Sequence, residues 1–208
     1  MVQGTIFLNL ASPRSSLFKD IIEYLGLDIE IAPKTDPRLA ANFPLQRTPS
    51  YLGSDGFKLH ETIAILVFLI SLKPAANTYN FYGKSGYETA QVWKWVSFTN
   101  SDMVNAFVHL LMLAKTQADK EKALSELETY AGLVEKQLRE TEYLVSNEIT
   151  LADIFAVQTF RWGFQTCWDA KWLSYHPYLE NWFYKVIRND PIASRSLKTF
   201  SPVEKAKF

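Results

Sequence analysis

The chain has 208 residues, of which 48% are hydrophobic and 21% are charged, a composition that suits a folded globular protein and excludes a disordered or fibrous one. Lys and Arg together number 22, as do Asp and Glu, so the net charge is +0 and no overall field attracts nucleic acid or anionic lipid. The amino terminus lacks a secretory signal pattern, and Ile63–Leu72, the most apolar stretch, is about half the ~20 residues of a membrane-spanning helix. We therefore expect a cytoplasmic protein that binds neither nucleic acid nor membranes.

The first third of the chain mixes strand and helix patterns. Apolar residues at helical spacing after Leu17 predict a helix that ends at Gly26, and Glu61–Leu72 predicts a second, largely buried helix. Short apolar or alternating runs predict four strands, with a hairpin turn at Ser54–Gly56 before the last. These strands are Thr5–Leu10, Asp28–Ala32, Pro49–Leu52 and Phe57–Leu59. The pattern indicates a mixed α/β domain over residues 1–73, in which residues 33–48 form a polar loop.

Residues 74–86 contain Pro74, Asn77 and two glycines without a helical period, which predicts a linker. Residues 87–208 then predict an all-helical domain. Its helices are expected at Tyr87–Leu113, Asp119–Glu140, from a capping box at Thr150–Asp153 to about Trp168, and from Pro177 to Arg188, where Pro191 stops the helix.

Three segments carry a resemblance to a known family. They are ASPRSS after the first strand, FPLQRTPSYLGSDGFKLHETIAILVFL in the middle, and SNEITLADI in the helical half. In this order they resemble the glutathione transferases, whose fold is a thioredoxin-like α+β domain followed by an all-α helical bundle. NFPLQRTPSYLG, WVSFTNSD and HPYLENWFYKVIRNDP are similar to the transferase-like domain of fungal elongation factor 1 gamma. Because those subunits continue into a further domain, we expect this chain to be a free-standing relative.

The resemblance implies a glutathione site in the first domain. Pro49 is cis in the family, which leaves the backbone of Thr48 available to pair with the ligand's cysteinyl unit. The Glu61 carboxylate would accept from the ligand's ammonium, and Thr62, at a helix start, would bind its carboxylate. Gln46 or Arg47 would reach the glycyl end. The alternatives are that Glu61 and Thr62 only cap a helix and that Arg47 is a solvated surface residue.

Ser12 occupies the position of the catalytic serine in serine-type transferases. A hydroxyl donor at a helix start favours a thiolate over a thiol. The alternative is that Ser12 is a plain helix cap, and Ser15 and Ser16 compete for either role. Arg14 would neutralise the thiolate or a ligand carboxylate, unless it is a solvated surface arginine.

Hydrophobic second substrates would contact the helical domain, for which Phe107, Met112 and Trp162 are candidates by residue type and rough position. Packing in the core is the alternative for all three. Asp153 is interpreted as structural, and Cys167, the only cysteine, as a small buried hydrophobe. The three histidines have no metal-ligand spacing, so no metal is predicted.

The sequence therefore supports two hypotheses of function. In the first, the protein is an enzyme that binds glutathione as a co-substrate, stabilises its thiolate and conjugates it to hydrophobic electrophiles. In the second, it is a non-catalytic scaffold that docks translation elongation factor subunits, since fold alone does not determine function. A two-fold homodimer is expected from the family in either case.

Overall fold

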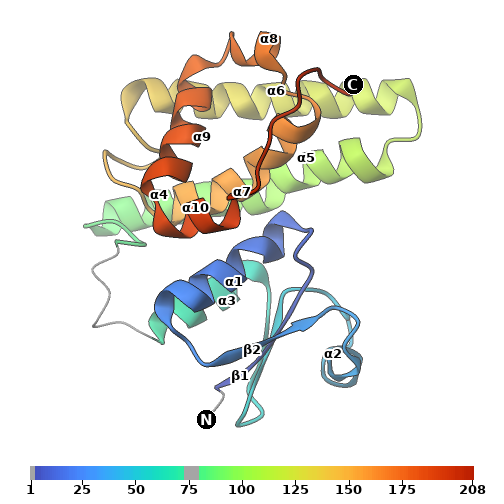
Figure 1. The fold of residues 1–208 in the computed structure, drawn as a ribbon, viewed down its shortest axis with the longest axis vertical. Helices are drawn as coiled ribbons and strands as arrows, with labels where there is room; N and C mark the ends of the chain where they lie inside the picture. The colour runs from blue at the N-terminus through green and yellow to red at the C-terminus, as the bar shows by residue number, and fades with distance from the viewer. Residues whose placement is uncertain (1–2, 73–79) are drawn as a thin grey trace. The chain divides into compact units, whose positions relative to one another are not determined.

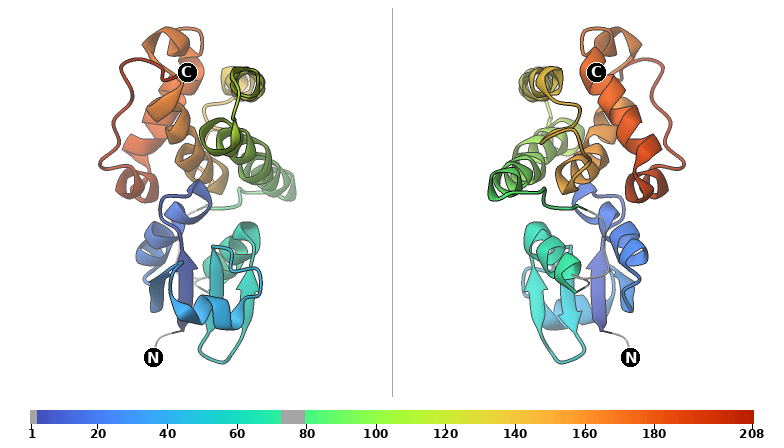
Figure 2. Two further views of the ribbon diagram at one scale, coloured as in Figure 1. Left: turned by 90° about the vertical axis from the view of Figure 1, so that its right-hand side faces the viewer. Right: turned by 90° about the vertical axis from the view of Figure 1, so that its left-hand side faces the viewer.

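The computed structural model describes residues 3–72 and 80–208, which form two compact units (Figure 1 and Figure 2). Unit 1 is Met1–Tyr79 and unit 2 is Asn80–Phe208. Of the predicted linker, residues 74–79 lie outside the described residues, and residues 80–85 form turns and bends that lead into the first helix of unit 2.

Unit 1 contains a mixed four-stranded sheet in the order β2-β1-β3-β4. β1 pairs with β2 in parallel and with β3 antiparallel, and β3 pairs antiparallel with β4. The sheet agrees with the predicted thioredoxin-like architecture, and its strands begin or end one or two residues from the expected positions. They are β1 (Gly4–Leu8), β2 (Ile29–Pro33), β3 (Ser50–Gly53) and β4 (Lys58–His60).

Two helices of unit 1, α1 (Pro13–Leu25) and α3 (Thr62–Ser71), lie side by side (Figure 1). The last turn of α1 is closed by Gly26, whose positive φ of 60° suits a residue without a side chain. A short helix, α2 (Pro37–Asn42), stands where we predicted a polar loop. Its Leu39 packs with Phe7 of β1 and Ala32 of β2, so tertiary packing stabilises a segment too short to show a helical period.

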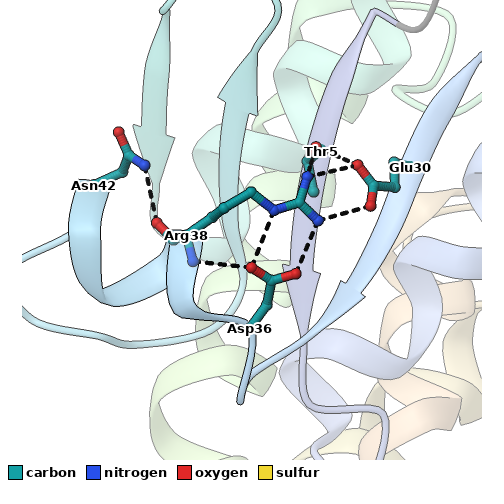
Figure 3. A network of polar contacts seen from close by, with 5 residues as sticks. All are labelled: Thr5, Glu30, Asp36, Arg38 and Asn42. Atoms are coloured by element: carbon teal, nitrogen blue, oxygen red, sulfur yellow. Dashed lines mark hydrogen bonds and ion pairs between the residues drawn. The ribbon is translucent and has the colours of Figure 1, made fainter.

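A polar network connects α2 to β1 and β2 (Figure 3). The guanidinium of Arg38 donates to Glu30 of β2 at 2.7 and 2.9 Å and to Asp36 at 2.8 and 3.0 Å. Thr5 of β1 also donates to Glu30, at 2.8 Å. These hydrogen bonds hold the pKa of the Glu30 carboxyl at about 2, and those from Arg38 have the largest effect.

Unit 2 begins with one long helix that covers the predicted Tyr87–Leu113. Two π-helical turns interrupt it, so it consists of α4 (Gly86–Phe98), η1 (Thr99–Met103), α5 (Val104–Val108) and η2 (His109–Leu113). α6 (Gln117–Glu140) follows, with a capping box formed by Thr116 and Asp119.

α7 (Leu151–Thr166) is the core helix of unit 2, and its first ten residues are all buried. The predicted capping box at its start is present. The Asp153 carboxylate accepts hydrogen bonds from the backbone N–H groups of Thr150 and Leu144, and from the indole N–H of Trp182 at 2.8 Å. Burial raises the pKa of Asp153, and these hydrogen bonds oppose that shift. Its contacts are therefore structural, as interpreted from the sequence.

Three further helices complete unit 2. They are α8 (Ala170–Leu173), α9 (Pro177–Asn189) and α10 (Pro191–Ser196). Pro191 does follow the end of α9, but the expectation that it only stops a helix was incomplete. Asp190 accepts hydrogen bonds from the N–H groups of Ile192 and Ala193, so Pro191 is the first residue of α10.

Candidate functional site

Three of the segments that the sequence singled out meet at one end of the sheet in unit 1. In the strand register Ser50 lies between Phe7 of β1 and His60 of β4. The chain leaves β1 shortly after Phe7 toward Ser12, enters β3 at Ser50 directly after Pro49, and leaves β4 at His60 directly before Glu61. The fold thus gathers residues that lie up to about 50 positions apart in sequence.

The peptide bond between Thr48 and Pro49 is cis, as expected from the resemblance. Pro49 is buried, and the Ser50 hydroxyl donates to the Arg47 carbonyl at 2.8 Å, which holds the segment before the proline against β3. Within residues 3–72 and 80–208 no hydrogen bond is formed by the backbone N–H or C=O of Thr48. Thr48 therefore has one backbone donor and one backbone acceptor that pair with no other described residue.

The N-terminus of α3 carries no side-chain cap. Glu61 occupies the capping position, but its side chain is exposed and accepts no hydrogen bond from the first turn. By contrast, a side chain caps the start of six other described helices, namely α1, α2, α4, α6, α8 and α10. The Glu61 side chain therefore does not cap α3, and the first N–H groups of this helix donate to no capping side chain.

The backbone of Glu61 is strained, with a φ of 78° at a residue that is not glycine. Such a conformation costs of order 1–3 kcal/mol and concentrates at ligand-binding positions. Gln46, which is exposed, also has a positive φ, of 48°. Thr62, the first residue of α3, is buried at 4% exposure.

Three charged side chains from separate segments lie within electrostatic range of one another. Partial burial lowers the pKa of Arg14, the Glu61 carboxylate opposes this shift, and the Arg47 guanidinium adds to it. Two cations and one anion give the cluster one net positive charge. Arg14 is half-buried, which argues against its interpretation as a solvated surface residue, whereas Arg47 is exposed.

Ser12 is the N-cap of α1, and its hydroxyl oxygen accepts from the Arg14 N–H at 3.3 Å. Accepting uses a lone pair and leaves the O–H able to donate, so the two roles considered for Ser12 are compatible. Ser15 is fully buried and Ser16 is half-buried. Of the three serines, Ser12 and Ser16 therefore have surface that a ligand can reach.

Two of the predicted second-substrate residues line a cavity of about 570 Å³ in unit 2. Met112 of η2 is 65% exposed, and Trp162 of α7 is half-buried. Phe107 has 0% exposure and packs edge-on against Trp162, with ring centroids 6.2 Å apart. Phe107 therefore supports Trp162 from the core and does not line the cavity.

The same cavity is also lined by residues that the sequence analysis did not identify, Ser201–Val203 and Lys207. Nothing in their local pattern signals a site, because they reach the cavity through contacts with α7 far earlier in the chain. Cys167 is buried, and burial raises the pKa of its thiol to about 12, so it is not a nucleophile at neutral pH.

No helix among the described residues is both long enough and apolar enough to cross a membrane. Within the same residues no three His, Cys, Asp or Glu side chains group as metal ligands would.

Comparisons with known proteins agree on one family. A model of the glutathione S-transferase C-terminal domain matches residues 88–190. The chain is 31% identical over 204 residues to a putative elongation factor 1 gamma homolog of Saccharomyces cerevisiae, and the match covers 91% of each. It is 29% identical over 194 residues to glutathione S-transferase AN1595 of Emericella nidulans, covering 88% of this chain and 72% of that protein.

Among solved structures, the GST-like domain of elongation factor 1-gamma from Saccharomyces cerevisiae superposes with a TM-score of 0.87 at 26% identity, covering 100% of this chain and 99% of that one. The chain spans about half the length of the elongation factor 1-gamma relatives it matches.

Proposed function

This chain belongs to the glutathione S-transferase family, and from that premise we propose that unit 1 binds glutathione and that the protein conjugates its thiolate to hydrophobic electrophiles. The observation that carries the proposal is the start of α3 without a side-chain cap, next to the exposed Glu61, at the sheet end that also holds the cis peptide bond. Relatives of both kinds, transferases and elongation factor subunits, are similar to this chain, so catalysis is the part that experiment must test.

Charge supports glutathione as the ligand. Near neutral pH the tripeptide carries two carboxylates and one ammonium, a net charge of minus one, and the Arg14, Arg47 and Glu61 cluster has the opposite net charge. The Glu61 carboxylate would accept from the ammonium, and the first N–H groups of α3 would bind the neighbouring carboxylate. Arg47 and Gln46, both exposed, would contact the glycyl carboxylate.

Backbone pairing would orient the middle of the ligand. The unpaired N–H and C=O of Thr48 would form an antiparallel pair with the cysteinyl unit, as an added strand does at a sheet edge. Pairing of this kind does not use the Thr48 hydroxyl. It fixes the direction of the cysteine side chain and so determines where the sulfur lies.

Ser12 would stabilise the sulfur as a thiolate. A free thiol has a pKa near 8.5, and each unit by which a donor lowers it is worth about 1.4 kcal/mol. The Ser12 O–H and the positive end of the α1 dipole both favour the anion. The thiolate would then attack the electrophilic carbon of an aryl halide, forming a carbon–sulfur bond as halide leaves. Arg14 would reinforce the anion by charge.

The test measures conjugation of 1-chloro-2,4-dinitrobenzene together with retention on immobilised glutathione. We expect both for the wild-type protein. Ser12→Gly removes the hydroxyl, and glycine costs an N-cap only a few tenths of a kcal/mol, so turnover should fall while retention persists. Absence of both retention and turnover in the wild type would refute the proposal.

A scaffold in translation is the second candidate function, favoured by the TM-score of 0.87 with the elongation factor 1-gamma domain. It predicts co-purification with elongation factor 1 subunits and no requirement for a glutathione site. Thermal stabilisation by millimolar glutathione distinguishes the transferase from the scaffold, because a ligand raises stability only if it binds the folded state. Stabilisation favours the transferase.

We also propose that the protein forms a homodimer in which α3 takes part. α3 is apolar on nearly all sides, and a helix of that kind is normally covered all round. Its Val67 is 43% exposed, as is Phe57, whose ring lies 5.3 Å from that of Phe68 on α3. This apolar patch supports an interface with a second copy.

A further inference from the structure

In unit 2, α8 and the start of α9 lie next to α6 (Figure 1). The Glu128 carboxylate of α6 meets two ring nitrogens there. The indole N–H of Trp172 donates to it at 2.6 Å, and Nε2 of His176 lies 3.3 Å from it. One carboxylate thus joins α6 to α8 and to the residue before α9, a region of residues 169–179 that we call the α8–α9 corner.

Both nitrogens of the His176 ring face hydrogen-bond acceptors, since Nδ1 lies 3.2 Å from the Trp172 carbonyl. A neutral imidazole has one N–H and can donate to only one of the two acceptors, whereas a protonated imidazole donates to both. The ring is also stacked on the Trp172 indole, with centroids 3.8 Å apart at an interplanar angle of 12°, and the face of an indole attracts a cation. The geometry therefore fits a charged His176 better than a neutral one.

Burial acts against this charge, because His176 is only 6% exposed. The ion pair itself is not sealed from water, since the Glu128 side chain is 55% exposed. The cost of desolvating the pair is therefore lower than it would be for a fully buried pair.

The other charges around the ring are mostly acidic. On the face of α6 that carries Glu128, on α8 with its cap, and on the first turn of α9, they are Glu121, Glu135, Arg139, Asp169, Lys171 and Glu180. Acids outnumber cations in this set, and Arg139 has a partner of its own in Glu135, at 3.9 Å. The surrounding charge therefore favours a proton on His176.

The α8–α9 corner also holds the last segment of the chain. Asp169 accepts from the N–H of Trp172 at 3.0 Å, which caps α8, and from the N–H of Ala206 at 3.2 Å. A change that loosens α8 would therefore also loosen the hold on the segment around Ala206.

We propose that His176 and Glu128 form a pH-dependent latch, in which protonation of His176 tightens the contact between the α8–α9 corner and α6. Histidine side chains change charge between about pH 5 and pH 8. The latch is therefore tight at the acid end of this range, and it loosens as the pH rises and the ring loses its proton. The inference does not depend on glutathione binding.

Amide hydrogen exchange of the full chain at pH 5.5 and pH 8 tests the latch. The measured quantity is the protection factor, which corrects for the intrinsic exchange rate at each pH. We expect about fivefold higher protection at pH 5.5 for the N–H groups of Trp172, Leu173 and Ala206, all of which donate to Asp169. Glu128→Gln keeps an acceptor for the Trp172 indole and removes the charge, so protection should then be equal at the two pH values.

Glu140→Gln, which removes an exposed acid at the end of the same helix, is the control and should keep the fivefold difference. His176→Gln should lose the difference, and combining it with Glu128→Gln should cause no further loss, because both substitutions remove the same interaction. If the buried His176 does not tolerate substitution, Glu128→Gln decides alone, since its side chain is largely exposed. Equal protection of the wild type at both pH values, or a pH difference that persists undiminished in Glu128→Gln, would overturn the inference.

Discussion

The side chain of Glu61 leaves a backbone with a φ of 78° and makes no capping hydrogen bond to α3. Its carboxylate therefore contributes little to folding and is available to a ligand. A strained residue persists only where the surrounding structure holds it, here β4 before it and α3 after it. The local pattern of Glu61 and Thr62 correctly predicted the start of a helix. The positive φ of Glu61 depends on tertiary packing, so it could not be predicted from the sequence.

Glu61→Gln removes the negative charge and keeps the shape of the side chain. We expect glutathione affinity to fall about 10- to 100-fold, since a hydrogen bond to a charged group is worth about 1.5–3 kcal/mol. The melting temperature without ligand should not change, because no intramolecular hydrogen bond is lost. Titration calorimetry measures the glutathione affinity, and a thermal melt measures the melting temperature. Glu140→Gln, an exposed substitution in unit 2, is the control, and an equal loss of affinity in that control would contradict the assignment.

Two other features of residues could not be read from the sequence. The strand register of the sheet brings together three segments that are distant in sequence and carry Arg14, Arg47 and Glu61. The electrostatic interaction among these side chains is therefore apparent only in the folded structure. Lys207 lies 45 positions after Trp162, and both line one cavity because hydrogen bonds hold the last segment of the chain against α7. By contrast, the Thr48-Pro49 segment was predicted because the motif itself specifies the local geometry.

Among the elements, long helices were predictable and short ones were not. α6 and α7 each have a clear apolar stripe and a capping box at the start. The helical period of the apolar residues and the capping residues therefore predict the same helices. α2 and α8, of 6 and 4 residues, are too short for a period. Their aspartate caps, Asp36 and Asp169, were the available signal, and a single cap before a polar segment also fits a turn.

The network around Arg38 makes the stability of unit 1 depend on pH (Figure 3). Hydrogen bonds, chiefly from Arg38, lower the pKa of Glu30 from 4.5 to about 2. The ionised Glu30 therefore stabilises the fold above pH 4.5, and this contribution is lost as the pH falls through 2. Arg38→Met should lower the urea midpoint slightly at pH 7, because the groups are exposed, and the difference from wild type should shrink below pH 4.5.

Lys19→Met is the control for this substitution, since Lys19 reaches its partner Glu23 only at 3.9 Å. The urea midpoint of Lys19→Met should match that of the wild type at pH 7 and at pH 2. If the difference between Arg38→Met and the wild type were the same at pH 2 and pH 7, the assigned origin of the pH dependence would be wrong.

The start of α9 is capped from another helix. His176 provides no side-chain cap, and Glu135 of α6 accepts from the N–H groups of Tyr178 at 3.3 Å and Leu179 at 2.7 Å. Because Glu135 is 4% exposed, Glu135→Ala should cost about 2 kcal/mol in the free energy of unfolding. Chemical denaturation measures this cost. Glu140→Ala, at the exposed end of the same helix, should leave stability unchanged, and an equal loss there would contradict the capping role.

For the whole molecule, the apolar patch formed by Phe57, Val67 and Phe68 predicts the oligomeric state. Val67→Glu introduces a charge where the proposed interface would exclude water, so the variant should be monomeric by light scattering while the wild type is dimeric. Because Val67 is 43% exposed, the fold of the variant should be retained, as circular dichroism would verify. A monomeric wild type would refute the role proposed for α3.

The central claim for the molecule is that glutathione binds at the sheet end where the Thr48-Pro49 bond and the start of α3 meet. Amide chemical shifts in an isotope-labelled sample titrated with glutathione test this most directly. We expect the largest shifts at the N–H groups of Thr48, Glu61, Thr62 and Ile63, with residues of unit 2 much less affected. Saturating glutathione that leaves these four amides unshifted would contradict it.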